Sequence, residues 1–340
     1  MVTGDPSSPQ EGHDEPSGIP GGGHGPPAGV ARKRATRAFR WSAAALGVGA
    51  AAAALTTAAL EVRPGRDPGH RHVSPTTRVP ASTAVDDTSF APGACAAFTP
   101  TSGDRHRTVF LDAGHGGPDP GGQGRTTSGR RIEEKTETLA TVLDTTQLLR
   151  ADGYRVVVSR TRDSAVARLS GGDLSGSVMS PSGDHKDLLA RARCANLAGA
   201  AALVSVHFNL DGHVSTGGAI TLFDADRSFS ARSRTLAGLL QHAIVAALAT
   251  HGWDVSDRGA TSNSTGGSTL TVQAAAYGHL LVLGPGKAGY NDQPSVMPGA
   301  LVEPLFISNP TEGSIADSPA GQHAIATGIA DALNTFLSAP

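Results

Sequence analysis

The stretch VFLDAGHGGPDPGGQG, residues 109–124, begins as a short apolar run and ends in a glycine-rich loop. An apolar run of this length, bounded by turn residues, predicts a buried strand. Two residues with chemically active side chains, Asp112 and His115, lie where the strand gives way to the loop. A turn needs glycine for its backbone, but it does not need an imidazole. The stretch therefore predicts a strand that delivers a functional side chain to the edge of a sheet.

Outward from this strand, extended and helical patterns alternate along the chain. Apolar residues recur at helical spacing from Glu133 to Ala151, and the runs YRVVVS and ALVSVHF are typical of buried strands. This alternation predicts an α/β fold of three layers, with helices on both faces of a mostly parallel or mixed sheet of about six strands. We expect one catalytic domain, residues 105–340. Further helices are predicted from Asp187 to Ala198, from Ser230 to His251 and from Pro319 onward, and further strands at AITLF, HLLVL and ALVE.

Changes in composition predict the remaining segments. Residues 1–40 are rich in proline, glycine and charged residues, and we expect them to be disordered on the cytoplasmic side. Residues 41–60 are uncharged and follow an arginine-rich cluster, which predicts a signal peptide or a signal-anchor transmembrane helix. An alanine-rich soluble helix is the alternative. Residues 61–104 are predicted to be a Pro/Thr/Ser-rich linker, and residues 170–184 and 263–269 to be flexible insertions.

Charge and cysteine content limit the possible partners. The 28 basic and 30 acidic residues give a formal net charge of −2, which gives no indication of a nucleic-acid partner. We expect a monomer that is exported, and that contacts the membrane through residues 41–60 if this segment is not cleaved. Because disulfides persist outside the cytoplasm, the two cysteines, Cys95 and Cys194, are predicted to form one. Two unrelated thiols, or Cys194 as a metal ligand, are the alternatives.

Candidate catalytic residues follow the predicted strands, where ligands gather in open α/β sheets. His115 follows the first strand, His207 ends ALVSVH and Glu303 ends ALVE, while Glu133 and Glu134 begin the first helix. Two imidazoles and a carboxylate match a catalytic zinc site, which leaves a fourth position for a water whose pKa falls to about 7. A further carboxylate could move the proton. Each residue taken alone has an ordinary explanation, such as a turn histidine or a glutamate stabilised by the helix dipole.

Five blocks in one order carry a family resemblance: VFLDAGHGGPDPGGQG, EEKTETLA, GYRVVVSRTRD, RARCANLAGAAALVSVHFN and ALVEPLFISNPTE. Together they resemble the zinc-dependent N-acetylmuramoyl-L-alanine amidases of the amidase_3 type, which are cell-wall hydrolases. The resemblance spans Thr108 to Leu337. It implies that His115, Glu134 and His207 bind Zn²⁺ and that Glu303 is the catalytic carboxylate.

The resemblance leaves several residues less defined. Asp112 is expected either to accept a hydrogen bond from a ligand imidazole or to bond to the loop. The family's arginine falls on Arg191, and Asn209 closes the histidine motif, so both are expected near the metal or the substrate. Glu133 stays open as the alternative ligand to its neighbour. The chain departs from the family pattern at Pro304, directly after the catalytic glutamate.

The implied reaction is hydrolysis of the amide that joins the lactyl group of N-acetylmuramic acid to L-alanine in peptidoglycan. It implies action in the extracytoplasmic cell envelope, by a protein that is either anchored or secreted after cleavage. Two other functions remain open. One is a catalytically silent, peptidoglycan-binding regulator on the same fold. The other is a different zinc peptidase of the cell wall, which needs a cation for a terminal carboxylate and could use Arg160, Arg162 or Arg191.

Overall fold

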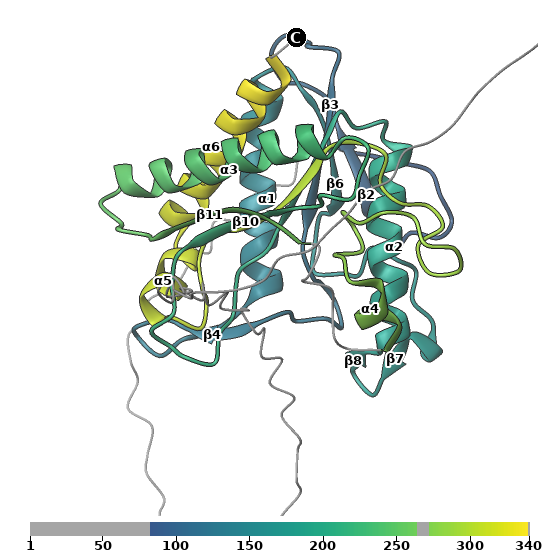
Figure 1. Cartoon of the computed structure of the whole chain (residues 1–340), viewed down its shortest axis with the longest axis horizontal. Coiled ribbons are helices and arrows are strands. Elements are labelled where there is room, and N and C mark those ends of the chain that lie inside the picture. The colour runs from purple at the N-terminus through teal and green to yellow at the C-terminus, as the bar shows by residue number, and fades with distance from the viewer. Residues whose placement is uncertain (1–81, 264–271, 339–340) are drawn as a thin grey trace, which may run out of the picture. The chain divides into compact units, whose positions relative to one another are not determined.

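The central sheet contains eight strands in the order β1 (Thr83–Ala84), β2 (Ala94–Phe98), β6 (Arg155–Arg160), β3 (Thr108–Ala113), β9 (Ala202–Val206), β12 (Gly299–Glu303), β10 (Ala219–Phe223) and β11 (Asp257–Ser262). The computed structural model describes residues 82–263 and 272–338 (Figure 1). The central strands β6, β3, β9 and β12 are parallel, whereas β10 runs antiparallel to β12. The predicted α/β fold with a mixed sheet is confirmed, with eight strands where about six were expected.

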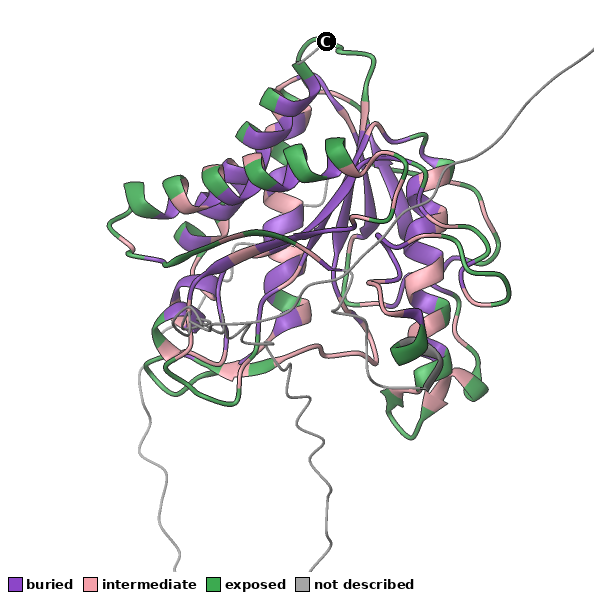
Figure 2. Ribbon diagram, in the orientation of Figure 1, coloured by how far each residue is buried: buried purple, intermediate pink, exposed green. Residues whose placement is uncertain are grey.

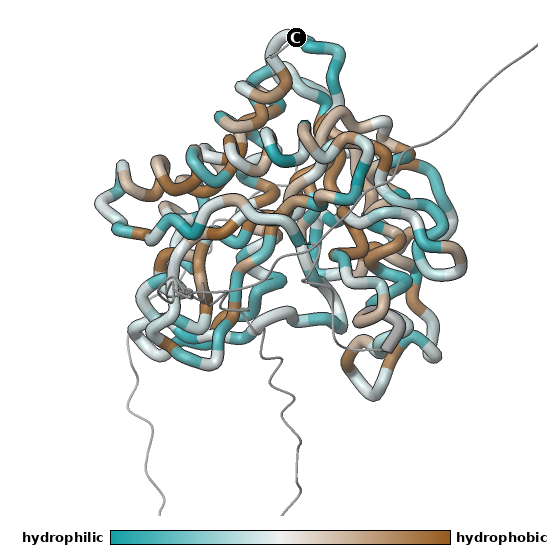
Figure 3. Tube along the Cα trace, in the orientation of Figure 1, coloured by the Kyte–Doolittle hydropathy of each residue, from teal (hydrophilic) through white to brown (hydrophobic). Residues whose placement is uncertain are grey.

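Helices cover both faces of this sheet, as predicted (Figure 1). Side chains alternate along β3, so Leu111 packs in the core with Val142 of α1, and Phe110 packs in the core with Ala195 of α2. The inner strands β2, β6, β3, β9, β12 and β10 are almost entirely buried, whereas the edge strands β1 and β11 are largely exposed (Figure 2). Hydrophobic stretches follow the inner strands (Figure 3). The first face carries α1 (Glu134–Ala151), α3 (Ser230–Thr250) and α6 (Pro319–Ser338), and the second carries α2 (Pro181–Leu197).

The smaller elements correct two sequence-based expectations. Residues 170–184 were expected to be a flexible insertion, but they contain a short 3₁₀ helix, a two-stranded hairpin and the first turn of α2. The Ser180 side chain caps that turn by accepting from the Gly183 amide at 3.2 Å. The strand predicted at 279–283 is instead a turn, whose leucines pack against the sheet without joining its ladder. The elements not yet given are β4 (Gln123–Arg125), β5 (Arg131–Glu133), η1 (Gly171–Asp173), β7 (Leu174–Ser175), β8 (Val178–Met179), α4 (Val272–Tyr277) and α5 (Pro310–Ala316).

The predicted linker, residues 61–104, is wrong at its C-terminal end. Two strands of the sheet, β1 and β2, lie within it, and all five residues of β2 are buried against β6. This strand is short and rich in alanine, and it follows residues rich in proline and threonine, so composition alone did not predict it. Within the described residues, no helix is long and apolar enough to cross a membrane. The predicted signal or anchor segment, residues 41–60, and most of the second insertion lie outside the described residues.

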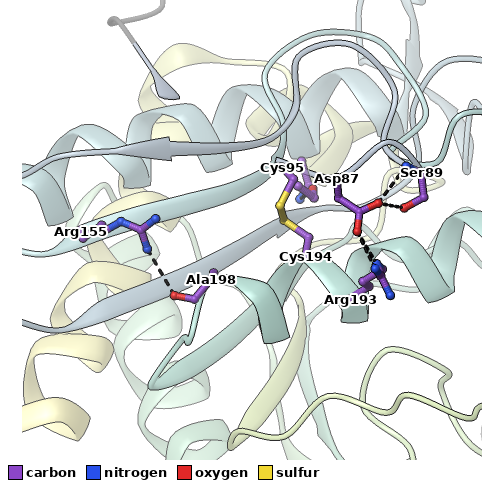
Figure 4. The surroundings of a disulfide bond; sticks show 9 residues. Asp87, Ser89, Cys95, Arg155, Arg193, Cys194 and Ala198 are labelled. Carbon is purple, nitrogen blue, oxygen red and sulfur yellow. Dashed lines mark hydrogen bonds and ion pairs between the residues drawn. A yellow bond between two sulfur atoms is a disulfide. The ribbon is translucent and has the colours of Figure 1, made fainter. Parts of the chain in front are cut away.

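A disulfide joins Cys95 on β2 to Cys194 on α2, as predicted (Figure 4). Both residues are fully buried, so the sequence alternatives of unrelated thiols and of a metal ligand at Cys194 are wrong. Beside the bond, Arg193 of α2 pairs with Asp87 at 2.6 Å, and Asp87 also accepts from Ser89 (Figure 4). The disulfide and this ion pair tie the first strands of the domain to α2.

Reducing this disulfide is expected to destabilise the domain strongly. The cysteines are 99 residues apart, and closing a loop of about 100 residues contributes at most about 4.7 kcal/mol in the chain-entropy model. Urea unfolding with and without reductant measures the loss as a lower midpoint. A Cys95→Ala/Cys194→Ala variant is the control, because its midpoint should not respond to reductant. An unchanged wild-type midpoint, with both thiols shown to be free, would contradict the expectation.

Candidate metal centre and active site

Three donor side chains meet at the edge of the sheet where β3 and β9 end. His115 lies two residues after β3, His207 directly follows β9, and Glu134 is the first residue of α1. Glu134 Oε1 lies 3.1 Å from His115 Nε2 and 3.0 Å from His207 Nδ1. The two imidazole nitrogens are 3.2 Å apart. These three residues form a group that could hold a metal ion, and they are the three that the sequence predicted as ligands.

Two glycines allow the rings to approach the backbone this closely. A Cβ atom on Gly114 would lie 2.4 Å from His207 Cε1, and one on Gly121 would lie 2.6 Å from His115 Cδ2. Both distances are far below van der Waals contact, so no other residue fits without moving a ring. His115 itself has a φ of 61°, in the left-handed region that few non-glycine residues adopt. The glycines of this loop therefore allow His115 to enter the group.

Backbone amides orient the carboxylate of Glu134. Its Oε1 accepts from the Phe208 amide at 2.9 Å, and its Oε2 accepts from the Gly122 amide at 2.7 Å. Although burial raises it, the pKa of Glu134 lies well below its usual value because the two imidazoles stabilise the charged form. Of the two glutamates that the sequence left open, the structure places Glu134 in the group. The Glu133 side chain is 44% exposed and points toward Lys135, outside the group.

Asp119 is a partner of the group that the sequence analysis missed. Its Oδ2 lies 2.7 Å from His115 Nδ1, and its Oδ1 accepts from the Gly121 amide at 3.0 Å. A carboxylate at Nδ1 favours the tautomer that leaves Nε2 free to bind a metal. The available signal was its place in the same loop, four residues after the histidine.

Asp112 acts on the loop through Arg191. Of the two roles left open for Asp112, the bond from an imidazole is not found, and the bond to the loop is indirect. Asp112 accepts from Arg191 Nη1 and from Ser205 Oγ, each at 2.7 Å. Arg191 also donates to the carbonyl oxygens of Ala113 and His115, each at 2.7 Å. The guanidinium is buried, and its donors hold the backbone of the loop that carries the first histidine.

Arg160, at the end of β6, is a second buried arginine that holds the same backbone. It donates to the carbonyl oxygens of Ala113 and Gly114, each at 3.0 Å, and to that of Lys135 at 2.6 Å. The sequence analysis considered it only as a cation for a substrate carboxylate. Because its donors point at backbone oxygens inside the protein, Arg160 is not available for that role.

Glu303 ends β12 on the same side of the sheet as the donor group, because β12 is parallel to β9. Its Oε2 is buried and has no hydrogen-bond partner among the described residues. Burial, and then the charge of Glu134, raise the pKa of Glu303 well above its usual value, while His115 lowers it. A buried carboxyl group with one free oxygen beside a metal-ligating group is suited to accept and return a proton.

Asn209 connects the loops that carry two of these residues. Its backbone N–H donates to the Leu305 carbonyl oxygen, and its backbone carbonyl oxygen accepts from the Ile307 N–H, each at 2.9 Å. This pairing continues the β9–β12 ladder past the strand ends and holds His207 beside Glu303. The described contacts of Asn209 are with these loops rather than with the donor group.

The fold and the geometry thus define an α/β protein with a metal-binding group and a buried carboxylate at the carboxyl ends of parallel strands, a combination typical of metal-dependent hydrolases. Comparison with protein families gives a match over residues 109–335 to the family described as N-acetylmuramoyl-L-alanine amidase, Amidase_3. The match covers more than half of the 340 residues. The chain belongs to this family of enzymes, which hydrolyse an amide bond of peptidoglycan.

One solved structure shows the same fold, and two others are similar to the chain. The chain is similar to the CwlD amidase of Clostridioides difficile, solved in complex with the GerS lipoprotein, with 22% identity, a TM-score of 0.52, and coverage of 69% of this chain and 100% of that chain. It is also similar to Ami1 of Mycobacterium smegmatis, with 22% identity, a TM-score of 0.47, and coverage of 70% and 100%. An amidase of Clostridium difficile 630 has 26% identity, a TM-score of 0.47, and coverage of 68% and 97%. No curated protein matches the chain.

Proposed function

We propose that this chain hydrolyses the amide between the lactyl group of N-acetylmuramic acid and L-alanine, with Zn²⁺ bound by His115, Glu134 and His207 and with Glu303 as the proton carrier. The observation that carries the proposal is the convergence of three donor atoms, 3.0 to 3.2 Å from one another. The family membership supports the amide-hydrolysis reaction, and the donor set supports the metal.

The donor set fits zinc. A tetrahedral Zn²⁺ centre with bonds of about 2.0–2.1 Å separates its ligand atoms by about 3.3 Å, close to the spacing of these donors. Two imidazoles and one carboxylate form one of the common ligand sets of catalytic zinc, which leave a fourth position open. A bound zinc would supply a water with a pKa near 7 and a Lewis acid for the carbonyl under attack.

The protein's own residues then account for the movement of protons. The free Oε2 of Glu303 accepts the proton of the attacking water and passes it to the amine of L-alanine as the carbon–nitrogen bond breaks. The carboxylate of Asp119 fixes the ring orientation of His115. Arg160 and Arg191 hold the backbone on either side of that histidine, so the donor group is rigid before the substrate arrives.

Two observations disfavour the alternative functions. A peptidase that trims the stem peptide needs a free cation for the terminal carboxylate. Of the three arginines available to it, Arg160 and Arg191 are buried with their donors on backbone and carboxylate oxygens, and Arg162 donates to the Pro92 carbonyl. A silent regulator has no need for a buried, unpartnered carboxyl group beside the donors, and Glu303 supplies one.

Digestion of purified peptidoglycan followed by mass spectrometry tests the proposal. Release of intact stem peptides with a free L-alanine amine, together with peptide-free glycan strands, is the expected result. Stems shortened at their carboxyl end would support the peptidase, and binding without release would support the regulator. Either outcome would overturn the proposal.

Replacing Asp119 by alanine is expected to weaken zinc binding by about 10- to 100-fold, because carboxylate partners of ligating histidines contribute that much to metal affinity. Competition with a chromophoric chelator measures the affinity without reference to activity. Asp163→Ala is the matched control, because Asp163 contacts the same loop at the Gly117 amide, 2.7 Å away, but contacts no ligand. Equal zinc affinities for the two variants would show that Asp119 only supports the loop.

We further propose that residues 41–60 export the domain, because peptidoglycan is assembled outside the cytoplasmic membrane and a basic cluster precedes this apolar segment. An enzymatic reporter fused after Pro80, active only outside the membrane, is expected to be active. Activity of a cytoplasm-specific reporter at the same position would contradict export. Comparison of chain masses from intact cells and from the medium then distinguishes an anchor from a cleaved signal.

A further inference from the structure

A second cluster of metal-ligating side chains lies at the other edge of the sheet. Because β10 is antiparallel to β12, its carboxyl end points away from the edge that carries Glu303. Asp224 directly follows β10, Asp226 is two residues further, and His279 belongs to the turn after α4. Their donor atoms lie within 4.8 Å of one another, and they form a second group in the described residues that could hold a metal ion.

The contacts within the cluster place one imidazole between two carboxylates. His279 Nδ1 lies 2.8 Å from Asp224 Oδ2, and His279 Nε2 lies 3.9 Å from Asp226 Oδ2. The Asp224 side chain is 2% exposed, whereas that of Asp226 is 61% exposed. The imidazole thus presents each of its nitrogens to a carboxylate, one of which is buried and the other open to solvent.

A fourth polar side chain at this edge has no partner. Asn263, directly after β11, is 2% exposed, and neither its Oδ1 nor its Nδ2 has a hydrogen-bond partner within the described ranges. The parallel register pairs Phe223 with Ser262, and the Asn263 amide continues the ladder by donating to the Phe223 carbonyl at 2.8 Å. The next pair along this register is Asp224 and Asn263. Because paired residues of parallel strands share a face, the side-chain carboxamide of Asn263 is placed on the same face as the carboxylate of Asp224.

The nearby guanidinium of Arg227 interacts with the charge of Asp224, but its donors are directed at other groups. Arg227 donates to the carbonyl oxygens of Leu283 and Gly284, at 2.7 and 2.5 Å, and to Ser295. Within the described residues it makes no ion pair with Asp224 or Asp226. The cluster therefore combines two carboxylates, one imidazole and one buried amide without a paired cation from an arginine or lysine.

We propose that this cluster is a second metal site, in which Nε2 of His279, the carboxylate of Asp226 and the Oδ1 of Asn263 bind a divalent transition-metal ion, while Asp224 orients the imidazole through Nδ1. Mixed imidazole and oxygen ligands suit Zn²⁺ or Mn²⁺ better than Ca²⁺, which takes oxygen ligands alone. The site joins the ends of β10 and β11 to the turn that follows α4, so its role is structural. It lies apart from the proposed catalytic centre and does not depend on it.

Metal content of the full chain, measured by inductively coupled plasma mass spectrometry after saturation with Zn²⁺ and removal of the excess, tests the proposal. We expect two ions per chain in the wild type and one in His115→Ala/His207→Ala, which removes the first site. We expect one ion in Asp226→Asn/His279→Gln. No ion in His115→Ala/His207→Ala, or no change in the last variant, would overturn the proposal in favour of a simple aspartate–histidine ion pair.

Matched variants keep the test decisive. His323→Gln/Asp144→Asn removes another aspartate–histidine pair, with a 2.8 Å contact and no third ligand, and should leave the metal count unchanged. If His279→Gln fails to fold, Asp226→Asn alone in the background that lacks the first site is sufficient, because this side chain is exposed. It is expected to weaken Zn²⁺ affinity at least about tenfold, since one charged ligand is lost. Unchanged affinity would overturn the proposal.

Discussion

Replacing Glu303 by glutamine is expected to lower turnover by about 10²- to 10⁴-fold while metal content stays at the wild-type level. Glutamine keeps the size of the side chain but cannot accept a proton at Oε2, the oxygen that has no partner among the described residues. The substitution removes proton transfer without removing a proposed ligand. Digestion of peptidoglycan, sampled at fixed times, measures turnover, and metal analysis of the same preparation measures metal content.

Glu133→Gln is the matched control for this variant. Glu133 is a glutamate near the same site, but its side chain is 44% exposed and points away from the donor group. Activity of this variant should remain within about twofold of the wild type, since exposed substitutions have small effects. Near-normal turnover of Glu303→Gln would remove Glu303 from the mechanism.

Replacing His115 by alanine is expected to abolish both activity and tight zinc binding at the catalytic site. The variant loses one of three donor atoms that lie 3.0 to 3.2 Å apart, and two remaining donors do not hold zinc against a chelator. Equilibrium dialysis against a chelator, with activity measured afterwards, gives both values.

His213→Ala serves as the control for His115→Ala, because His213 is an exposed histidine on the loop after β9. It should keep both metal and activity. Wild-type zinc occupancy at the catalytic site in His115→Ala would mean that the metal site has been assigned to the wrong residues.

The layers of the fold, the two histidine donors and the buried glutamate could be predicted because their signals are local, whereas Glu134 was named only by the family resemblance. Buried strands appear as unbroken apolar runs, and His115, His207 and Glu303 stand where such runs end. Parallel strands then bring their carboxyl ends to one edge without further information. The edge strand β2 could not be predicted, because Ala94–Phe98 is short and rich in alanine, and its burial depends on pairing with β6.

The contacts that hold the donor group in place could not be predicted, because they depend on which way side chains point in three dimensions. Asp112 was expected either beside an imidazole or bonded to the loop, but the alternation of β3 places it on the same face as Phe110, toward α2, where Arg191 lies. Asp119 is further along the chain, yet the loop turns back and brings it to His115. Closeness along the chain therefore did not identify the aspartate that contacts the imidazole.

The inward direction of Arg160 and Arg191 was likewise invisible in the sequence, where a charged residue at a strand end indicates substrate binding as readily as structure. In the fold, both guanidinium groups donate to carbonyl oxygens of the loop that carries the first histidine. This use of two arginines is what distinguishes the site from one that binds a peptide carboxylate.

Hydrolysis of peptidoglycan in ¹⁸O-labelled water tests the central claim most directly, because the label marks the carbonyl that water attacks. The account predicts one ¹⁸O atom in the lactyl carboxylate of the N-acetylmuramic acid product, and unlabelled stem peptides that begin with a free L-alanine amine. The label should be absent from both products with Glu303→Gln over the same time. An ¹⁸O atom in a carboxylate of the stem peptide, with the lactyl amide intact, would contradict the account.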